Sequence, residues 1–573
     1  MPSVMPIAKR HLLINALPDT IRGRLALMES ELIASEELQG DLHFINLIGR
    51  LHAEGVEAVS FVPASKFDAD YARYASRSGV GENEIQQLAI DLLARAFECG
   101  ATDIHLAHMG THVRSRFRVL GLLRDDQEYD ADTGARMIRA IYEHLGAAQD
   151  APAFDVNSRL DGRIINRDYL PQGLYSVRIH SEPIECDGAP DGKGTFMPLR
   201  LLRDTTGASG SLENRLTMLG YTSEDVTLYD NEGHERVAGA QTAMFRELSS
   251  RTGIVFISGP TGSGKSTALS HCMEALIEER PGDNFLSIED PPEKPIKGMY
   301  QIPVISREGG ERGAAYTEAI AGTNRDDTDT VMIGEVRYAE AALATIEVAL
   351  SGNSVWATIH AADALGIIQR LDVQLRSLVA NPLQVVCDPI VLSGLVFQRL
   401  VPMLCPHCKI PLRENPDAIS KDCLTRLKRA MPEELIYGGA HGEGIFLRGH
   451  GCQHCKDSGH PGLYRQTVVA EIVNLDAEIL ALLREHRREE ARTYWLTELR
   501  GMTYLEHARH LIATGVLGPM ITEEMLAMPI DEDIQIMNAL RAHMKAKAVN
   551  TAPASPSAVN AHSTRSAKKR RGY

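Results

Sequence analysis

Residues 259–266 read Gly-Pro-Thr-Gly-Ser-Gly-Lys-Ser, a glycine-rich segment that ends in Lys265 and Ser266. It follows an apolar run at residues 254–257 and precedes a helical pattern at residues 267–279. In this context backbone N–H groups wrap phosphates at a helix N-terminus, Lys265 reaches the β- and γ-phosphates, and Ser266 places its hydroxyl on Mg²⁺. About 0.02 such matches are expected by chance in a chain of this length. The segment therefore predicts a nucleotide site, which consists of Gly259, Pro260, Thr261, Gly262, Ser263, Gly264, Lys265, Ser266 and Thr267.

Three other strand-like runs end in side chains suited to phosphate chemistry. Residues 285–288 lead into Glu289, residues 331–333 into Glu335, and residues 355–359 into His360. Ligands of an open parallel sheet bind at the carboxyl ends of its strands, so we expect these side chains to face the nucleotide. Either carboxylate can serve the Mg²⁺ that Ser266 also holds. Arginines that can neutralise phosphoryl charge lie near these runs: Arg325, Arg337 and Arg370.

Four cysteines form two Cys-x-x-Cys pairs, Cys405 with Cys408 and Cys452 with Cys455. Two such pairs can bring four thiolates to one tetrahedral Zn²⁺, which would be structural because its shell is closed. A redox dithiol usually shows a single pair, so zinc is the favoured interpretation. His407 and His454 are possible substitute ligands. Five other cysteines are expected to be inert buried thiols: Cys99, Cys186, Cys272, Cys387 and Cys423.

Apolar periodicity and composition divide the chain into seven parts. They are residues 1–80, a helical or docking region; 83–203, an α+β domain; 204–244, a linker; 245–400, a domain with the βαβ pattern of a parallel sheet; 401–475, the cysteine module; 476–543, helices; and 544–573, a disordered basic tail. The fold class is therefore α/β for the part that carries the phosphate loop.

Composition excludes several classes of protein. The chain has 573 residues, of which 44% are hydrophobic and 24% charged, as in folded globular proteins. A net charge of −16 makes nucleic acid an unexpected partner. The sequence shows neither an apolar run long enough to span a membrane nor a signal peptide, so we expect a cytoplasmic protein.

Several motifs occur in the order found in the secretion ATPases that power type II secretion and type IV pilus assembly, and the chain resembles that family over roughly residues 85–530. The matching segments are residues 101–105 (Ala-Thr-Asp-Ile-His), 116–121, 161–163, 177–178, 199–200, the phosphate loop, 288–293 (Ile-Glu-Asp-Pro-Pro-Glu), 333–337 (Ile-Gly-Glu-Val-Arg), 357–361 (Ala-Thr-Ile-His-Ala), 398–401 and 451–455. Residues 464–471 also resemble the pilus-assembly proteins of conjugative plasmids and mobile elements, which suggests a thin-pilus ATPase.

The resemblance implies a RecA-like motor domain with a phosphate loop, preceded by a PAS-like α+β domain and carrying a small zinc module with four cysteine ligands. It implies Mg²⁺-dependent ATP hydrolysis, with Glu289 as general base, Glu335 near Mg²⁺ and His360 on the γ-phosphate. Four arginines are carried over as nucleotide contacts: Arg163 and Arg178 from the α+β domain, and Arg325 and Arg337 from the motor domain. The cofactors would be ATP, Mg²⁺ and Zn²⁺.

The family also implies partners and a location. A homo-hexameric ring would convert ATP hydrolysis into movement of an inner-membrane platform protein, to which this cytoplasmic chain would attach. Departures from the family pattern at Tyr338, Asn353 and Ala321 put the finer nucleotide contacts in question. Two alternatives stay open: a nucleic-acid translocase or helicase with the same type of motor, and a nucleotide-binding switch without turnover.

Overall fold

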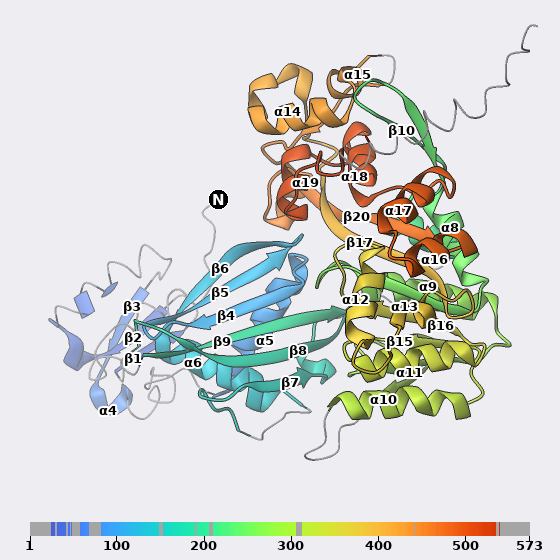
Figure 1. Cartoon of the computed structure of the whole chain (residues 1–573). Helices are drawn as coiled ribbons and strands as arrows, with labels where there is room; N and C mark the ends of the chain where they lie inside the picture. Colours follow the sequence, from blue (N-terminus) through green and yellow to red (C-terminus); the bar gives the residue numbers. More distant parts are fainter. Residues whose placement is uncertain are drawn as a thin grey trace, which may run out of the picture. The chain divides into compact units, whose positions relative to one another are not determined.

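The computed structural model describes residues 24–28, 31–41, 44–45, 47–48, 58–67, 82–147, 153–189, 192–204, 210–304, 312–439, 442–534 and 538 (Figure 1). Its contacts group into two compact units, one made mainly of Met1–Ala208 and the other mainly of residues 209–573. The basic tail predicted for residues 544–573 lies outside the described residues. Within the described part of the chain, no helix is long and apolar enough to cross a membrane.

The described part of residues 1–80 contains a small β-sheet, which corrects the expectation of a helical region. β1 (Leu25–Met28) pairs antiparallel with β2 (Glu31–Ser35), and β2 pairs in parallel with β3 (Ala58–Val62). Short helical turns follow at η1 (Glu36–Leu38) and α4 (Ala64–Lys66). Apolar runs of four or five residues have the same appearance in a strand and in a buried helix, so periodicity alone could not separate the two.

Residues 82–204 form the expected α+β domain. Six strands make an antiparallel sheet in the order β6-β5-β4-β9-β8-β7. They are β4 (Asp103–His108), β5 (His112–Val119), β6 (Leu122–Asp130), β7 (Leu160–Ile164), β8 (Leu174–Glu185) and β9 (Lys193–Arg203). Burial alternates along β5, as it must when only one face is covered. The covered face packs with α5 (Glu82–Glu98), α6 (Ala131–Ala140) and the π-helical turn η3 (Ile141–Leu145).

Residues 210–244 are folded and are not the linker that their polar composition suggested. They form α7 (Leu212–Leu219), the antiparallel pair β10 (Val226–Tyr229) and β11 (Glu235–Ala238), and the start of α8 (Gln241–Ser249). Leu212, Leu216 and Tyr221 are buried in the same hydrophobic cluster as Val255, which belongs to the strand before the phosphate loop. A few apolar residues at helical spacing were enough to attach this segment to the second unit.

The domain that carries the phosphate loop is built on a seven-stranded sheet in the order β14-β13-β15-β16-β12-β17-β20. Its strands are β12 (Gly253–Ser258), β13 (Phe285–Glu289), β14 (Tyr300–Pro303), β15 (Thr330–Ile333), β16 (Ser354–Ile359), β17 (Leu392–Leu404) and β20 (Leu463–Asn474). The pairs from β14 across to β17 are parallel, as the βαβ pattern predicted. The sheet extends beyond the predicted boundary at residue 400, because β20 and the end of β17 belong to it.

Both faces of this sheet are buried. Ile254 and Phe256 of β12 join one hydrophobic cluster, whereas Val255 and Ile257 join the other. Parallel strands need helices on both sides, and the first cluster includes α10 (Arg312–Gly322), α11 (Ala339–Leu350), α12 (Gly366–Leu375) and α13 (Pro382–Val386). The second cluster contains residues of α7, α8 and α9 (Lys265–Glu279).

The cysteine region and the C-terminal helices complete the chain. Around the first cysteine pair lie β18 (Ile410–Pro411), α14 (Lys421–Ala430), α15 (Glu433–Tyr437) and β19 (Phe446–Leu447). The turn η8 (Gln453–Ser458) carries part of the second pair. The region predicted to be helical, residues 476–543, contains α16 (Ala477–Arg484), α17 (Arg488–Thr497), α18 (Tyr504–Ala513) and α19 (Pro519–Leu526) in its described part.

Candidate nucleotide site

The phosphate loop connects β12 to α9 and requires glycine at two positions. Gly264 precedes the helix with a φ of 84°, and Gly259 leaves the strand with a φ of 147°, both of which disfavour side chains. A Cβ at Gly259 would also clash with the carbonyl oxygen of Gln398 on β17. Lys265 Nζ donates to the carbonyl oxygens of Gly259 at 2.8 Å and Pro260 at 3.1 Å. Its ammonium group therefore lies inside the phosphate loop.

Two buried residues support this loop, and the sequence analysis gave neither of them a role. Gln398 Nε2 donates to the carbonyl oxygen of Ser263 at 2.8 Å, and Tyr221 donates its hydroxyl to Gln398 Oε1 at 2.5 Å. Gln398 is fully buried and Tyr221 is almost so. A glutamine inside the apolar strand β17 was an available signal, since a buried amide needs partners.

The carboxyl edge of the sheet brings Glu335 and His360 together. Glu335 follows β15 and His360 follows the neighbouring β16, and Glu335 Oε1 lies 3.0 Å from His360 Nε2. Arg337 Nη2 donates to the other oxygen, Oε2, at 2.6 Å. Burial opposes ionisation of Glu335, but Arg337, His360 and Lys265 outweigh it and hold its pKa below the ordinary value. The carboxylate is therefore ionised at neutral pH.

Glu289 sits at the end of β13, which pairs with β15. Its Oε1 accepts hydrogen bonds from Ser287 Oγ and Gln301 Nε2, both at 2.8 Å. The buried Tyr316 connects the two acidic segments, because its hydroxyl donates to the Ile288 carbonyl at 3.3 Å and accepts the Glu335 N–H at 3.0 Å. Burial raises the pKa of Tyr316 to about 12, so it remains a neutral donor.

Arg325, a predicted site residue, and Asn353, a departure from the family pattern, both lie away from the phosphate loop. Arg325 is exposed on η5 (Thr323–Arg325), and the residues after it bond to Asn284 at the start of β13, so it lies at the amino edge of the sheet. Asn353 lies at the same edge, where its side chain donates to the Val348 carbonyl at 3.2 Å. Asn353 therefore does not touch this chain's own phosphate site.

Arg163 and Arg178 belong to the first unit. They are register partners on β7 and β8 of the antiparallel sheet. Arg163 Nη2 donates to Ser176 Oγ at 2.9 Å, which holds its guanidinium along the sheet. Their contact with nucleotide stays a prediction.

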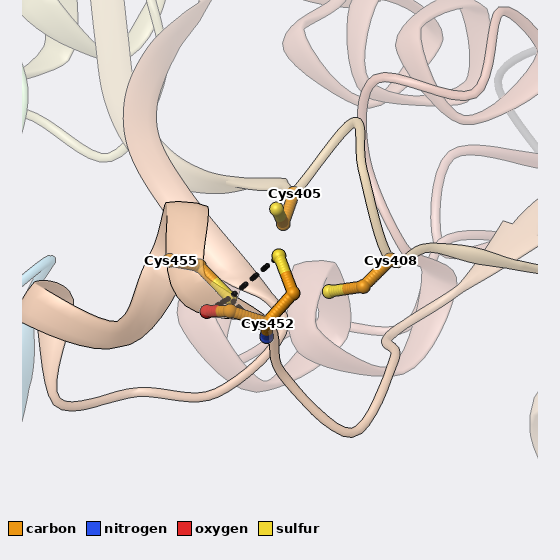
Figure 2. Close-up of side chains that lie close together, drawn as sticks. All are labelled: Cys405, Cys408, Cys452 and Cys455. Atoms are coloured by element: carbon orange, nitrogen blue, oxygen red, sulfur yellow. Dashed lines mark hydrogen bonds between the residues drawn. The ribbon is translucent and has the colours of Figure 1, made fainter.

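The four paired cysteines form one cluster, with all four sulfur atoms within 4.8 Å of one another (Figure 2). A tetrahedron with Zn–S bonds of about 2.3 Å has edges of about 3.8 Å, and Cys452 Sγ lies 3.9 Å from Cys455 Sγ. The N–H groups of Cys452 and Gly462 donate to Cys455 Sγ at 3.2 and 3.3 Å, contacts that stabilise a thiolate. The cluster consists of four sulfurs, and His407 and His454 are exposed outside it.

Comparison with protein families identifies the chain. The family described as Type II/IV secretion system protein matches residues 197–527, more than half of the chain. The chain belongs to this family. This confirms the family resemblance that the order of the motifs indicated.

Individual relatives of this secretion ATPase have low sequence identity to it, but they align with most of its length. It is 28% identical to the putative type II secretion system protein E of Escherichia coli over 406 residues, which cover 70% of this chain and 68% of that protein. It is also 28% identical to the type IV pilus assembly ATPase PilB of Thermus thermophilus, over 70% of this chain and 38% of PilB. The structure of the ATPase DotB of Legionella pneumophila matches with a TM-score of 0.50 and 17% identity, covering 77% of this chain and 95% of DotB, which shows the shared fold.

Replacing Gly259 by alanine should destabilise the motor domain more than the same change at Gly262. Both glycines have positive φ, a cost of about 1–3 kcal/mol for alanine, but only Gly259 is crowded by Gln398 and Ser263. Overpacking adds about 1–3 kcal/mol at Gly259. Scanning calorimetry of the two variants measures the difference as a lower melting temperature for Gly259→Ala. Equal melting temperatures would contradict the proposed crowding.

Proposed function

We propose that this secretion ATPase binds ATP with Mg²⁺ at the carboxyl edge of its motor sheet and uses hydrolysis to drive pilus assembly or protein secretion. The observation that carries the proposal is the convergence of Lys265, Glu335 and His360 beside the phosphate loop in a chain of this family. The residues fit Mg²⁺, because Glu335 is an ionised carboxylate beside the loop that carries the Ser266 hydroxyl.

Each side chain has a proposed role in this reaction. Lys265 leaves its loop carbonyls to neutralise the β- and γ-phosphates. His360 contacts the γ-phosphate and thereby distinguishes ATP from ADP. Glu289, held by neutral donors at the neighbouring strand end, accepts a proton from the attacking water. Bound Mg²⁺ would supply charge neutralisation during phosphoryl transfer.

We further propose a homo-hexameric ring, in which some arginines serve a neighbouring site. Arg325 lies at the edge of its sheet opposite its own phosphate loop, so it can act only on another chain's nucleotide. Arg163 and Arg178 would approach nucleotide from the α+β domain, and Arg337 would stay with Glu335. Cations placed in this way stabilise the charge of a transferring phosphoryl group.

The partner would be an inner-membrane platform protein, with the ATPase on the cytoplasmic side and peripheral to the membrane. The relatives named for type II secretion and for type IV pilus assembly support a motor of this class. The cysteine module favours assembly over retraction, and the segment at residues 464–471 favours a thin pilus of a mobile element.

Mixing two inactive variants tests whether Arg325 of one chain serves the nucleotide site of the next chain in the ring. Arg325→Ala should lower ATP turnover at least about tenfold, and Lys265→Ala should do so too. If Arg325 serves the neighbour, mixing the two variants should restore part of the turnover, because some sites then combine an intact Lys265 with an intact Arg325. Phosphate release measures turnover, and Arg413→Ala, which removes an exposed arginine of the cysteine module, is the control. An Arg325→Ala chain with normal turnover, or a mixture without recovery, would refute this assignment.

DNA added to the same phosphate-release assay tests the translocase alternative. A secretion motor should turn over ATP at the same rate with and without DNA, since the chain carries a net charge of −16. Stimulation by DNA would favour a translocase instead. Nucleotide binding without any phosphate release would favour the switch.

A further inference from the structure

The segment that follows His360 connects the proposed γ-phosphate contact to the C-terminal part of the motor unit. β16 ends at Ile359, and α12 begins at Gly366. His360 is the first residue of the short connection between them, and its ring lies 3.0 Å from Glu335. The position of the imidazole therefore depends on what holds residues 361–365.

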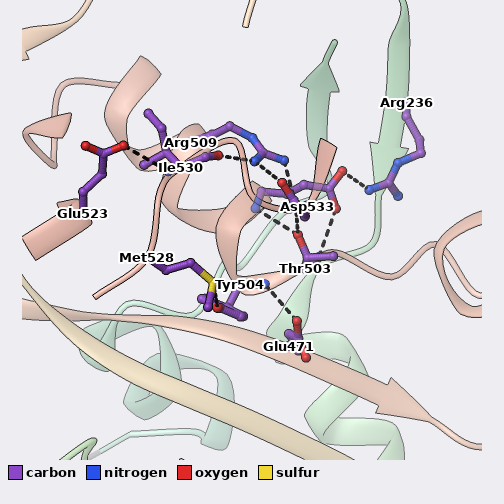
Figure 3. A network of polar contacts seen from close by, with 10 residues as sticks. Arg236, Glu471, Thr503, Tyr504, Arg509, Glu523, Met528, Ile530 and Asp533 are labelled. Carbon is purple, nitrogen blue, oxygen red and sulfur yellow. Dashed lines mark hydrogen bonds and ion pairs between the residues drawn. The ribbon is translucent and has the colours of Figure 1, made fainter. Parts of the chain in front are cut away.

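Glu471 of β20 holds this segment from inside the protein. Its side chain is almost completely buried. Oε2 accepts the N–H of Ala364 at 2.9 Å, and Oε1 accepts the N–H of Tyr504 at 3.3 Å. Figure 3 shows the contact with Tyr504, the first residue of α18. One carboxylate thus joins the His360 segment to a helix N-terminus, where free N–H groups favour an anion.

The start of α18 is a firm anchor, because a network of polar contacts fixes it (Figure 3). Thr503 and Glu506 cap the helix reciprocally, and Arg236 of β11 binds Glu506 at 2.6 Å. Asp533 accepts hydrogen bonds from the Thr503 hydroxyl at 2.8 Å and from Arg509 at 2.5 Å. Tyr504 cannot shift without breaking several of these buried contacts.

Ion pairs hold the same segment from its outer side. Asp363 accepts the N–H of Gly366 at 2.7 Å, which forms the turn into α12. Arg488 of α17 donates to both oxygens of Asp363, at 2.7 and 2.6 Å, and Arg492 of α17 lies 3.3 Å from one of them. Residues 363–364 are therefore held between β20, α17 and α18.

We propose that Glu471 is a positioning residue for ATP recognition: by binding the N–H groups of Ala364 and Tyr504 it keeps His360 directed at the γ-phosphate. This inference rests on the proposed function, in which His360 contacts that phosphate. It assigns to the C-terminal helices a direct effect on how strongly the motor prefers ATP over ADP. A movement of α17 or α18 would change that preference.

The preference for ATP over ADP should depend on whether Glu471 is ionised. Burial and the neighbouring Asp363 carboxylate raise the pKa of Glu471 to about 7, while the N–H groups of Ala364 and Tyr504 and the charge of Arg492 oppose the shift. Above that pH the carboxylate can accept both N–H groups; below it, the protonated oxygen is a poorer acceptor. The preference for ATP should therefore weaken in the wild-type protein between about pH 8 and about pH 6.

Calorimetric titration with a non-hydrolysable ATP analogue and with ADP tests the inference. Glu471→Gln places an amide NH₂ against one of the two N–H groups and should weaken binding of the analogue about tenfold, with ADP affinity nearly unchanged. Arg488→Ala, which removes a partly exposed contact to Asp363, should act in the same direction. Glu489→Gln, an exposed change on α17, is the matched control and should alter neither affinity. In Glu471→Gln the change across the same pH range should also be smaller than in wild type, because the glutamine amide does not ionise there.

The outcomes separate this inference from the proposed function. Equal weakening of both nucleotides, or an unchanged ratio in folded Glu471→Gln, overturns the role of Glu471. If Glu471→Gln does not fold, an unchanged ratio in Arg488→Ala overturns it instead. His360→Ala, measured beside them, tests the function itself: if it leaves the ratio unchanged, His360 does not contact the γ-phosphate and the proposed function fails at that residue.

Discussion

Lys265→Ala should reduce ATP turnover by about 10²–10³-fold, equivalent to about 2.7–4 kcal/mol of transition-state stabilisation. Lys265 stands at the first position of α9, and its ammonium lies 2.8 Å from the Gly259 carbonyl, inside the loop that would surround the phosphates. A cation preorganised there neutralises phosphoryl charge without a large rearrangement. Phosphate release in the presence of Mg²⁺ measures the loss.

The control for this change is Lys428→Ala, which removes the same charge from the exposed surface of α14. It should leave turnover unchanged, since a surface ion pair contributes little. Lys265→Ala should also retain the wild-type melting temperature, because the hydrogen bonds of the lysine to Gly259 and Pro260 stay within one loop. A folded Lys265→Ala chain with normal turnover would show that the loop is not the hydrolytic site.

The strands that carry the site were predictable from sequence because each is a short apolar run followed at once by the functional side chain. Glu289, Glu335 and His360 lie at the ends of β13, β15 and β16, which are adjacent in the sheet. The rule that ligands bind at the carboxyl ends of parallel strands then placed these side chains at one edge without further information. The glycines of the phosphate loop were predictable for the same local reason.

The supporting contacts were not predictable, because they join residues far apart in the chain. Tyr221 meets Gln398, and Glu471 meets Ala364, only after β17 and β20 have joined the rest of the motor sheet. Local patterns also misjudged residues 210–244, where Tyr221 lies. The apolar residues of that segment are few, and their burial depends on a tertiary surface that no local window contains.

Mutation of Cys455 should remove a structural zinc and unfold the cysteine region. Cys455 is buried, and its sulfur lies 3.9 Å from that of Cys452, a separation suited to one tetrahedral ion. Binding of zinc by four thiolates contributes on the order of 10 kcal/mol to the folding of small domains, so its loss is costly. We expect one zinc per wild-type chain by elemental analysis, almost none in Cys455→Ser, and a lower melting temperature. A strong chelator should have the same effect on the wild-type protein.

A point substitution is the sharper test here, because deleting residues 401–475 would also remove β20 and the end of β17 from the motor sheet. Cys99→Ser provides the matched control: this partly exposed thiol donates to the Ala96 carbonyl at 3.3 Å, a contact that a serine hydroxyl can replace. It should keep both the zinc and the melting temperature. A wild-type chain that holds no zinc as purified, or one that keeps its melting temperature after treatment with the chelator, would instead show that the four thiols act through packing alone. If the zinc prediction holds, the cysteine cluster fixes the chain just before β20, and the position of Glu471 on that strand depends on the metal.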